Sequence, residues 1–400
     1  MIPEKEGEVA VRLLEDVRVL DLGSFITAPL AAMLLAEFGA DVIKVERPGG
    51  DPFRAFGKGT YSPQFQAHNR HKRSVVLDTG TPEGLAAFDQ LAEGADVLVI
   101  NTRPGAAERA GMGWERLRGI NPRLIWCGIT GFGPDGPAAL RPAFDNVGQA
   151  VSGWMSRHRS GDDPRVAGPA VSDAATGLYA ALGILAALHE RGRTGRGHRI
   201  DLSMLEATIA LGTEPLGQYL ATGKPVPIYQ RAAMSQAYTL TCADGHRIGL
   251  HLSSPDKFWR ALCTAIDRPA WVEKYPQRID RVAAYEEIAA RLNEVFRARP
   301  RAEWVAVLER HDIPFAAENR LEDLEADPQV VHLGLFGEVV HPTRGPMRMP
   351  RRPVSVDGSR EMEARPPPEL GEHTAEVLRR AGIGEDVIAT VLAARRAPPD

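Results

Sequence analysis

The sequence predicts an α/β protein in which a doubly wound large domain carries an inserted, smaller α+β domain. Strand and helix patterns alternate over about the first 140 residues, as in a parallel sheet covered by helices. The helices then lengthen, and two Pro-containing connectors, 222–236 and 342–354, enclose a stretch with a strand and helices of its own. A length of 400 residues also exceeds what one core usually spans. We therefore expect a large domain over 1–224 and 341–400 and a small domain over 225–340.

The first part of the chain should form parallel strands separated by helices. A helix begins near Pro29, a residue that suits the first helical position, and ends at Gly39. Another helix opens at Thr81. Two strands joined through a helix within about thirty residues form a βαβ unit, which makes the sheet parallel. The expected strands are 17–22, 41–46, 74–79, 96–101 and 122–130.

Longer helices and a second unit follow. We expect helices at 143–156, 173–191 and 203–221, with a turn at 192–197 and a strand at 198–204. The small domain should contain a strand at 247–252 and helices at 255–266, 283–297 and 301–311. A helical pattern returns near the end of the chain, at 369–383.

Composition bears on location and partners. The net charge of −4 and the pI near 6.3 do not favour nucleic acid as a partner. No window approaches the apolar length needed to span a bilayer, and the acidic start lacks the apolar core of a signal peptide. Cys127, Cys242 and Cys263 are far apart and are expected to be buried thiols. We therefore expect a cytoplasmic protein without nucleic-acid or membrane partners.

Common catalytic and cofactor motifs are weak or missing. The segment GFGPDG at 131–136 has the spacing of a dinucleotide-binding loop, but its Pro-Asp-Gly end is typical of a turn and no acidic residue follows at the required distance. Another phosphorylated ligand at this loop remains open. His68 and His71 lie among basic residues, and no metal-ligand spacing occurs, so we expect no metal site. Without a GxSxG serine or a cysteine in a nucleophile's context, a carboxylate is the main catalytic candidate.

Asp173 is the one charged residue in the apolar segment 170–188. An aspartate at the head of a helix is a favoured N-cap, because its carboxylate lies against the positive end of the helix dipole. A nucleophile held on a rigid helix would suit the same position. This segment alone does not decide between the two interpretations.

Basic residues gather in segments beside the expected strands. They are Arg47 and Arg54, then Arg70, Lys72 and Arg73, and then Arg103 and Arg109. Ligands of open α/β sheets bind at the carboxyl ends of the strands, so we expect these segments to converge on one edge. Arg and Lys suit phosphates there, and the pattern favours a phosphate-rich ligand over a merely solvated surface.

Many segments, in one order, resemble the class III CoA-transferases (CaiB/BaiF type), the family of formyl-CoA and carnitine CoA-transferases. The resemblance runs from about residue 15 to about 380 and is carried by FGADVIKVERPGGDPFR, NRHKRSVVLD, NTRPGAAERAGMGWERLRGINPRLI, RPAFDNVGQAVSG and DAATGLYAALGILAALHERGRTGRG. It implies a Rossmann-like large domain that binds CoA, and an interlocked homodimer. It also implies an acyl-CoA donor and a carboxylic acid acceptor, with coenzyme A as substrate and no tightly bound cofactor.

The same resemblance assigns roles to single residues. Asp173 matches the family's catalytic aspartate, which forms a mixed anhydride with the acyl group and then an aspartyl-CoA thioester. A helix N-terminus would stabilise charge developing beside that carboxylate. The residues that match CoA contacts are Phe25, Ile26, Arg47, Lys72, Arg73, Asn101, Arg103, Arg109, Arg141 and Phe144.

Two departures from the family patterns affect the expected activity. The related α-methylacyl-CoA racemases use a His–Asp pair where this chain has Phe144, and phenylalanine cannot carry a proton. A transferase is therefore favoured over a racemase, and the intact Asp173 argues against an inactive CoA-binding paralogue. Residues 229–238 lack the glycine run of formyl-CoA transferase, which puts formate and oxalate in doubt. Arg231, Arg141 and His251 are unranked candidates for binding the acceptor.

Overall fold

The structure is a computed structural model that describes residues 12–57, 59–158, 162–253, 255–360 and 364–394 of the 400-residue chain. It divides into two compact units, which we call the large unit (Met1–Thr213 with Gly334–Asp400) and the small unit (Glu214–Leu333). The large unit thus combines two separate segments of the chain.

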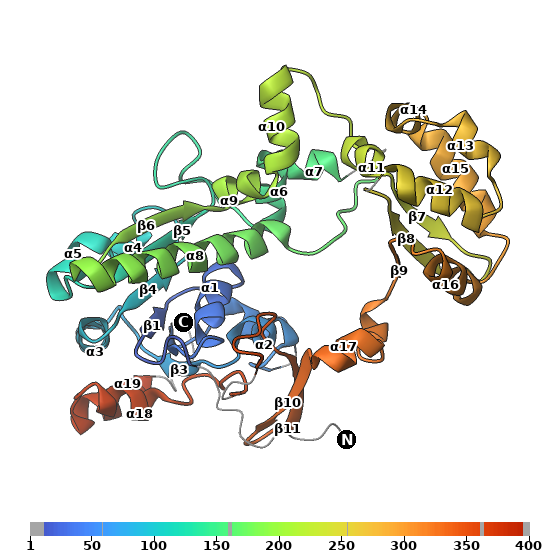
Figure 1. The fold of residues 1–400 in the computed structure, drawn as a ribbon. Helices are drawn as coiled ribbons and strands as arrows, with labels where there is room; N and C mark the ends of the chain where they lie inside the picture. The colour runs from blue at the N-terminus through green and yellow to red at the C-terminus, as the bar shows by residue number, and fades with distance from the viewer. Residues whose placement is uncertain (1–11, 58, 159–161, 254, 361–363, 395–400) are drawn as a thin grey trace. The chain divides into compact units, whose positions relative to one another are not determined.

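The large unit is built on a six-stranded parallel sheet with the order β3-β2-β1-β4-β5-β6 (Figure 1). The predicted α/β class is confirmed. Because the strand order reverses direction between β1 and β4, this gap is the topological switch point, where open α/β sheets bind ligands. The strands are β1 (Arg18–Asp21), β2 (Asp41–Glu46), β3 (Arg73–Val76), β4 (Val97–Ile100), β5 (Ile125–Thr130) and β6 (Arg199–Ser203).

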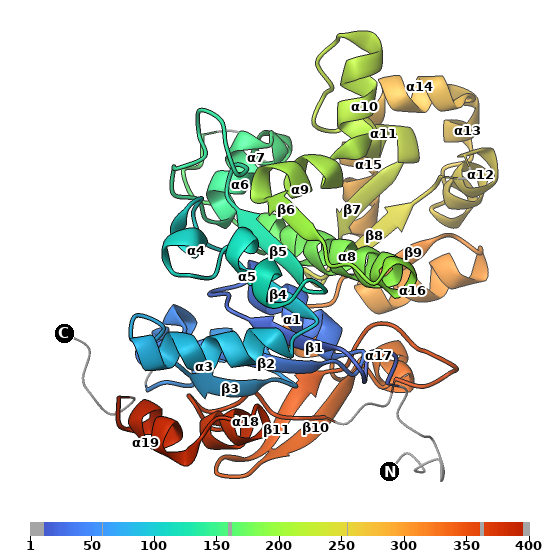
Figure 2. The same ribbon diagram turned by 90° about the vertical axis from the view of Figure 1, so that its left-hand side faces the viewer.

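Helices pack on the large sheet (Figure 2). They do so through two separate apolar clusters. Neighbouring strand residues point to opposite faces, so Val19 joins one cluster and Leu20 the other. The first cluster contains residues of α1 (Thr27–Ala36) and α8 (Val171–Thr194). The second contains residues of α3 (Pro82–Glu93), α5 (Trp114–Ile120), α18 (Thr374–Arg380) and α19 (Glu385–Ala394).

Helix α8 is unusually apolar. With 24 residues and a mean hydropathy of 1.5 it is long and apolar enough to cross a membrane, so the expectation that no window approaches such a length was wrong. In the structure the helix packs against α1 and the sheet, and Ala180 and Ile184 are fully buried. Gly177 permits the close approach of α1, because a Cβ there would lie 2.8 Å from the Leu30 Cδ2 atom.

Several expected helices are divided in the structure. The segment 143–156 forms α6 (Asp145–Val151) and α7 (Trp154–Arg157), separated at Gly153, whose φ of 80° interrupts the helix. The segment 203–221 forms α9 (Met204–Leu211) and α10 (Thr213–Thr222), with Gly212 as the C-cap of α9.

The segment 342–354 is not the connector that its prolines and arginines suggested. Strands β10 (Phe336–His341) and β11 (Gly345–Pro350) pair antiparallel as a hairpin. A two-stranded sheet consists only of edge strands, so prolines such as Pro346 are tolerated within it.

The small unit contains a three-stranded antiparallel sheet of order β7-β8-β9 packed against helices. Its core includes Trp259, Phe296 and Trp304. Cys242 and Cys263 of this unit are buried, as is Cys127 of the large unit. The expected linker 222–236 contains a short helix, and the expected helix 283–297 is mainly α15. The elements are α11 (Gln230–Ser235), β7 (Ala237–Thr241), β8 (Arg247–His251), α12 (Pro255–Ala265), α13 (Ala270–Lys274), α14 (Arg278–Ala283), α15 (Tyr285–Phe296), α16 (Arg301–Arg310), β9 (Phe315–Ala317), η2 (Leu321–Asp323) and α17 (Pro328–Leu333).

Candidate active site at the carboxyl end of the parallel sheet

Buried charges hold the backbone that follows β1. The Asp21 carboxylate, at the end of β1, accepts a hydrogen bond from Lys72 Nζ at 2.8 Å and lies 3.6 Å from Lys44 Nζ. Lys44 Nζ also donates to the carbonyl oxygen of Gly23 at 2.9 Å, and Lys72 Nζ donates to that of Pro29 at 2.8 Å. All three charged side chains are fully buried. They therefore fix the start of the loop and the start of α1 from beneath.

Burial and attraction oppose each other in this network. Burial alone would raise the pKa of Asp21, but the ammonium groups of Lys44 and Lys72 outweigh it and hold that pKa below its ordinary value. For Lys72 burial dominates and lowers the pKa to about 8, although Asp21 acts in the other direction. The three donors of Lys72 go to Asp21, to Pro29 and, at 2.8 Å, to Asn69. The ammonium group is thus committed to oxygens of its own chain.

Phe25 lies in the loop 22–26 between β1 and α1, which we call the Phe25 loop. Its backbone is left-handed (φ 62°), which is rare for a bulky residue and indicates a constrained segment. Its N–H donates to Asp51 Oδ1 at 3.2 Å. Asn101 binds the preceding Ser24 twice, donating from Nδ2 to the Ser24 carbonyl at 2.7 Å and accepting from the Ser24 N–H at 2.9 Å. Because Ser24 follows β1 and Asn101 follows β4, this clamp spans the switch point of the sheet.

Four phenylalanines gather around the same loop. The Phe25 ring meets Phe53, Phe56 and Phe144 edge to face, with centroid separations of 5.3, 6.4 and 5.5 Å. Phe53 belongs to the short helix η1 (Pro52–Ala55). Phe56 and Phe144 stay 59% and 62% exposed. Exposed aromatic rings beside a constrained loop offer an apolar surface to a ligand.

A side chain from another helix caps the N-terminus of α8. Asp145, the first residue of α6, accepts through Oδ1 from the N–H groups of Ser172 at 2.9 Å and Asp173 at 3.3 Å, and Gln149 donates to its Oδ2 at 2.6 Å. The N-cap residue of α8 is Ala170, whose side chain caps nothing. The interpretation of Asp173 as the N-cap was therefore wrong: it lies inside the first turn, and Asp145 performs the capping.

Close packing holds this cap in place. A Cβ at Gly148 of α6 would lie 2.1 Å from Ser172 Oγ, so the two helices approach each other where only glycine fits. Ser172 Oγ also lies 2.7 Å from Thr208 Oγ1 of α9. The packing of α6, α8 and α9 thus determines how Asp145 faces Asp173.

The Asp173 carboxyl has a strongly raised pKa. Burial raises it first and the negative charge of Asp145 adds to this, bringing the pKa to about 7. Near neutral pH the group is therefore divided between its neutral and ionised forms, as is common for catalytic carboxyls. The first-turn N–H groups are already occupied, by Asp145 and, for Val171, by the carbonyl of Pro169 at 2.8 Å. The expected stabilisation by this helix end is thus limited to its dipole.

Four of the arginines predicted to contact CoA are accessible. Arg47 follows the carboxyl end of β2, and Arg103 follows that of β4. Arg109 ends the short helix α4 (Ala106–Arg109), and Arg141 lies close to the start of α6. All four side chains are exposed, whereas that of Lys72 is buried.

Arg54, Lys72 and Arg73 instead bind groups of the chain itself. Arg73 is the first residue of β3, and its guanidinium donates to Asp41 at 2.6 and 2.7 Å. Arg54 is buried and donates to Glu46 at 2.7 and 2.8 Å. The expectation that all basic segments converge on one edge was wrong for Arg73. Because its segment precedes a strand, Arg73 lies at the amino end of the parallel sheet.

The glycine loop 131–136 does not form a dinucleotide-binding turn. Gly136 lies outside any helix, and α6 begins only at Asp145. A Cβ at Gly131 would lie 2.4 Å from the Ala143 Cβ, so packing accounts for this glycine. The guanidinium of Arg141 lies 5.3 Å from the centre of the Phe132 ring. This loop supports the residues that lead into α6.

The sequence analysis did not identify Asp145, Phe53 or Phe56 as residues of the site. Asp145 and Gln149 have the four-residue spacing of an interacting pair on one helix, which marks a helix start but not the cap of a different helix. Arg231 and His251, considered for the acceptor, lie in the small unit, where Arg231 pairs with Glu214 at 3.2 Å. Among the described residues no cluster of three His, Cys, Asp or Glu could hold a metal ion.

Comparisons with known proteins point to one family. The model of CoA-transferase family III matches residues 14–374. The chain is 35% identical to the succinyl-CoA:glutarate CoA-transferase of Homo sapiens, with 96% of this chain and 90% of that protein covered. It is 35% identical to the succinyl-CoA:mesaconate CoA-transferase of Haloarcula marismortui (92% and 96% covered) and 32% identical to the formyl-CoA:oxalate CoA-transferase of Rhodopseudomonas palustris (95% and 96%). The crystal structure of a CaiB/BaiF family protein from Brucella suis matches with a TM-score of 0.80 at 30% identity, covering 92% of this chain and 98% of that one.

Proposed function

The chain belongs to CoA-transferase family III, and we propose that it transfers CoA through covalent intermediates on Asp173. The family resemblance inferred from the sequence segments is confirmed, and with it the class of enzyme. Enzymes of this class use CoA thioesters as substrates and move CoA to a free carboxylic acid.

One continuous set of contacts supports the role of Asp173. The Phe25 loop lies at the switch point of the sheet, the Phe25 ring meets Phe144 at 5.5 Å, and Asp145 follows Phe144 directly. Asp145 in turn accepts from the backbone of Asp173 at 3.3 Å. The carboxyl with the raised pKa therefore lies next to the edge of the sheet where this fold binds its ligands.

The proposed reaction consists of two related halves. An ionised Asp173 oxygen attacks the thioester carbonyl, the C–S bond breaks, and CoA leaves as a thiolate, which gives a mixed anhydride. The thiolate then attacks the Asp173 carbonyl carbon, the donor leaves as a carboxylate, and an aspartyl-CoA thioester forms. The acceptor carboxylate attacks this thioester and forms a second anhydride with loss of the thiolate. Attack of the thiolate on the acceptor's acyl carbon releases the new acyl-CoA and restores the Asp173 carboxylate.

No external base is required, because Asp173 is ionised at the start and at the end of the cycle. A carboxylate of raised pKa is a stronger nucleophile than an ordinary one, and a pKa near 7 still leaves a large ionised fraction in neutral solution. Asp145 fixes the backbone of the first turn, so it acts as a positioning residue for the attack.

We place CoA along the carboxyl end of the sheet. Arg47, Arg103 and Arg109 are suited to its phosphates, because exposed guanidinium groups make bidentate bonds to phosphate oxygens. The apolar surface of the Phe25 loop is suited to the pantetheine arm, together with Ile26, Asn101, Arg141 and Phe144. We assign Lys72 and Arg73 to the support of the sheet instead of to direct phosphate contact.

A short dicarboxylic acid is the proposed partner of the thioester. Glutarate, mesaconate and oxalate occur in the names of the relatives, and all are short dicarboxylic acids. Residues 229–238 form α11 and the start of β7 and contain no glycine. Because the glycine run of formyl-CoA transferase is missing, we favour the other candidates over oxalate and formate. Mass spectrometry of a panel of acyl-CoA donors and acids would identify the preferred pair.

We also propose that the enzyme is a homodimer, interlocked as the family resemblance implies. Leu178, Leu182 and Leu185 lie on one face of α8, at spacings of four and three residues, and are 56%, 61% and 38% exposed. A row of three exposed leucines on one face of a helix is typical of a surface that another protein covers.

Asp173→Asn tests the catalytic proposal directly. The amide keeps the size of the side chain but is a far poorer nucleophile, so CoA transfer should fall by orders of magnitude. The free energy of unfolding at neutral pH should stay the same or rise, since the substitution removes a charge that burial disfavours. Hydroxylamine added after the acyl-CoA should modify the parent protein on Asp173, as peptide mapping would show.

Asp201→Asn is the matched control, because Asp201 is an exposed carboxylate paired with Arg199 at 2.8 Å on β6. It should retain the parent rate and still give the hydroxylamine adduct on Asp173. Transfer at the parent rate by a folded Asp173→Asn protein would contradict the covalent mechanism while leaving the family assignment intact.

A further inference from the structure

Asp51 joins the Phe25 loop to the segment that follows β2. It is the N-cap of η1, and its Oδ1 atom accepts from the Phe53 N–H at 2.9 Å and from the Phe25 N–H at 3.2 Å. Its Oδ2 atom lies 2.9 Å from Lys44 Nζ. Asp51 is 3% exposed, and the side chain of Lys44 is fully buried. One buried carboxylate thus connects two segments that each carry a phenylalanine of the site.

The backbone of Asp51 is itself fixed by a buried ion pair. Glu46, the last residue of β2, accepts from the Asp51 N–H through Oε2 at 3.0 Å. The same oxygen accepts from Arg54 Nε at 2.7 Å, and Oε1 accepts from Arg54 Nη2 at 2.8 Å and from Ser74 Oγ at 2.7 Å. The side chains of Glu46 and Arg54 are both 2% exposed. Because β2, η1 and β3 all contribute, Asp51 is a rigid support for the Phe25 loop.

The Phe25 loop depends on such support because its backbone is strained. A bulky residue keeps a left-handed φ of 62° only where the surrounding contacts impose it. Asn101 binds the N–H and the carbonyl of Ser24 from the side of β4, and Asp51 binds the N–H of Phe25 from the side of β2. These two strands flank β1 in the sheet. Without the bond from Asp51, the Phe25 backbone would relax and its ring would move.

From these contacts we infer that Asp51 is a positioning residue for acyl-CoA and acts through the backbone and ring of Phe25. The inference rests on the proposed placement of CoA along the Phe25 loop. An apolar surface that binds the pantetheine arm equally in the ground state and the transition state changes KM and leaves kcat unchanged. Asp173 is held separately, by the cap from Asp145. Loss of the bond between Asp51 and Phe25 should therefore raise KM without lowering kcat.

Two substitutions of Asp51 separate this bond from the charge. Asp51→Asn keeps an oxygen for the N–H groups of Phe25 and Phe53. Asp51→Ser also provides a favoured N-cap, but its shorter side chain serves η1 alone and does not reach Phe25. Both variants remove the negative charge beside Lys44, so they share that loss of stability. In transfer from succinyl-CoA to glutarate, the KM for succinyl-CoA should be roughly tenfold higher for Asp51→Ser than for Asp51→Asn, as the loss of one hydrogen bond predicts, with equal kcat.

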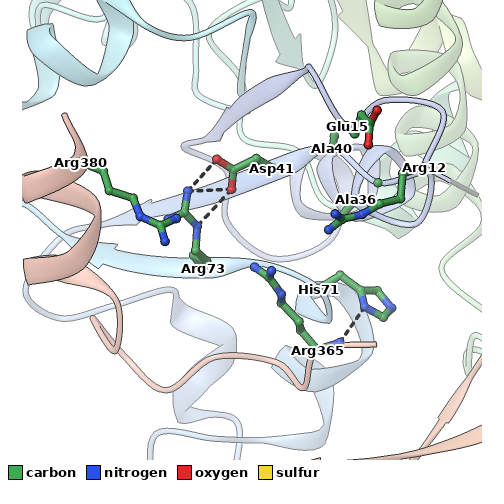
Figure 3. Close-up of a pocket in the computed structure, with 10 residues that line it drawn as sticks. Arg12, Glu15, Ala36, Ala40, Asp41, His71, Arg73, Arg365 and Arg380 are labelled. Atoms are coloured by element: carbon green, nitrogen blue, oxygen red, sulfur yellow. Dashed lines mark hydrogen bonds and ion pairs between the residues drawn. The ribbon is translucent and has the colours of Figure 1, made fainter. Parts of the chain in front are cut away.

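Asp41→Ser is the matched control for lost stability. Asp41 begins β2 and pairs with Arg73 at 2.6 Å, at the amino end of the sheet and away from the proposed CoA site (Figure 3). This variant should lower the midpoint of urea denaturation and keep the parent KM. Circular dichroism checks that each variant is folded. If the unpaired Lys44 unfolds both Asp51 variants, they are compared in a Lys44→Met background, which removes that unpaired charge.

Isothermal titration with free CoA keeps this test independent of the covalent mechanism. The dissociation constant of CoA should be higher for Asp51→Ser than for Asp51→Asn by the same factor as KM. Equal KM values and equal CoA affinities of the two variants would overturn the role of Asp51 and leave the proposed transfer through Asp173 intact. A parent protein that does not bind CoA would overturn this inference together with the proposed function.

Discussion

Two aspartates set the chemistry at the scale of single residues. Asp173 provides the proposed nucleophile. Asp145 caps the helix that carries Asp173, and its charge adds to the burial that raises the Asp173 pKa. Asp173 could be found from the sequence because it is the one charged residue in the apolar segment 170–188. Asp145 could not be assigned its role, because a cap that crosses between helices depends on tertiary packing and leaves no local pattern. Lys72 and Arg73 show the same limit: their type suggested phosphate binding, but burial committed both to carboxylates of the chain.

The raised pKa predicts how activity and stability depend on pH. An ionised Asp173 is needed for attack, so kcat/KM should rise with pH through an inflection near 7. The folded state holds the proton more tightly than the unfolded state does, so Asp173 makes the free energy of unfolding fall as pH rises from the ordinary aspartate range to about 7. Asp145→Asn keeps an oxygen for the cap but removes the repelling charge, and should move the inflection of the pH–rate profile to lower pH. An unchanged profile in that variant would show that Asp145 has no electrostatic influence on the reaction.

At the scale of elements, α8 combines a predicted helix with contacts that periodicity does not reveal. The apolar run predicted the helix, whose bounds moved from 173–191 to Val171–Thr194. The hairpin of β10 and β11 was missed because its prolines and arginines are typical of linkers, whereas isolated edge strands tolerate both. The division of two expected helices into α6 and α7 and into α9 and α10 was missed, because a single glycine in the sequence does not indicate whether a helix continues or ends there.

Two glycines of α8 provide an internal comparison of packing with helix propensity. Gly177→Ala should destabilise the protein by about 1–3 kcal/mol, because its Cβ would overlap Leu30 of α1. Gly192→Ala, in the last turns of the same helix, has no atom within 4 Å of the new Cβ and should stabilise by up to about 1 kcal/mol. Urea denaturation of both variants measures the difference. Equal effects would mean that α1 and α8 do not pack as closely as described.

For the whole molecule, the exposed leucines of α8 lead to a prediction about assembly. Sedimentation or light scattering should give a mass of twice 43.5 kDa at micromolar concentration. Leu182→Glu places a charge in the apolar stripe and should reduce that mass or the yield of folded protein, because an uncompensated charge is costly in an interface. Gln218→Glu in α10, which adds the same charge at an exposed polar position, is the control. A mass of one chain for the parent would contradict the proposed dimer.

The charges beneath the Phe25 loop and those around its rim should respond differently to ionic strength. Mobile ions screen exposed charges over a distance of about 8 Å at physiological salt, but they do not enter a dry interior. Added salt should therefore weaken the attraction of Arg47 and Arg103 for CoA phosphates and raise KM. Lys44 and Lys72, which hold the loop itself, are fully buried and should keep their positions. In a salt titration, kcat should thus stay nearly constant while KM increases, so that the enzyme loses affinity for its substrate without losing the shape of its site.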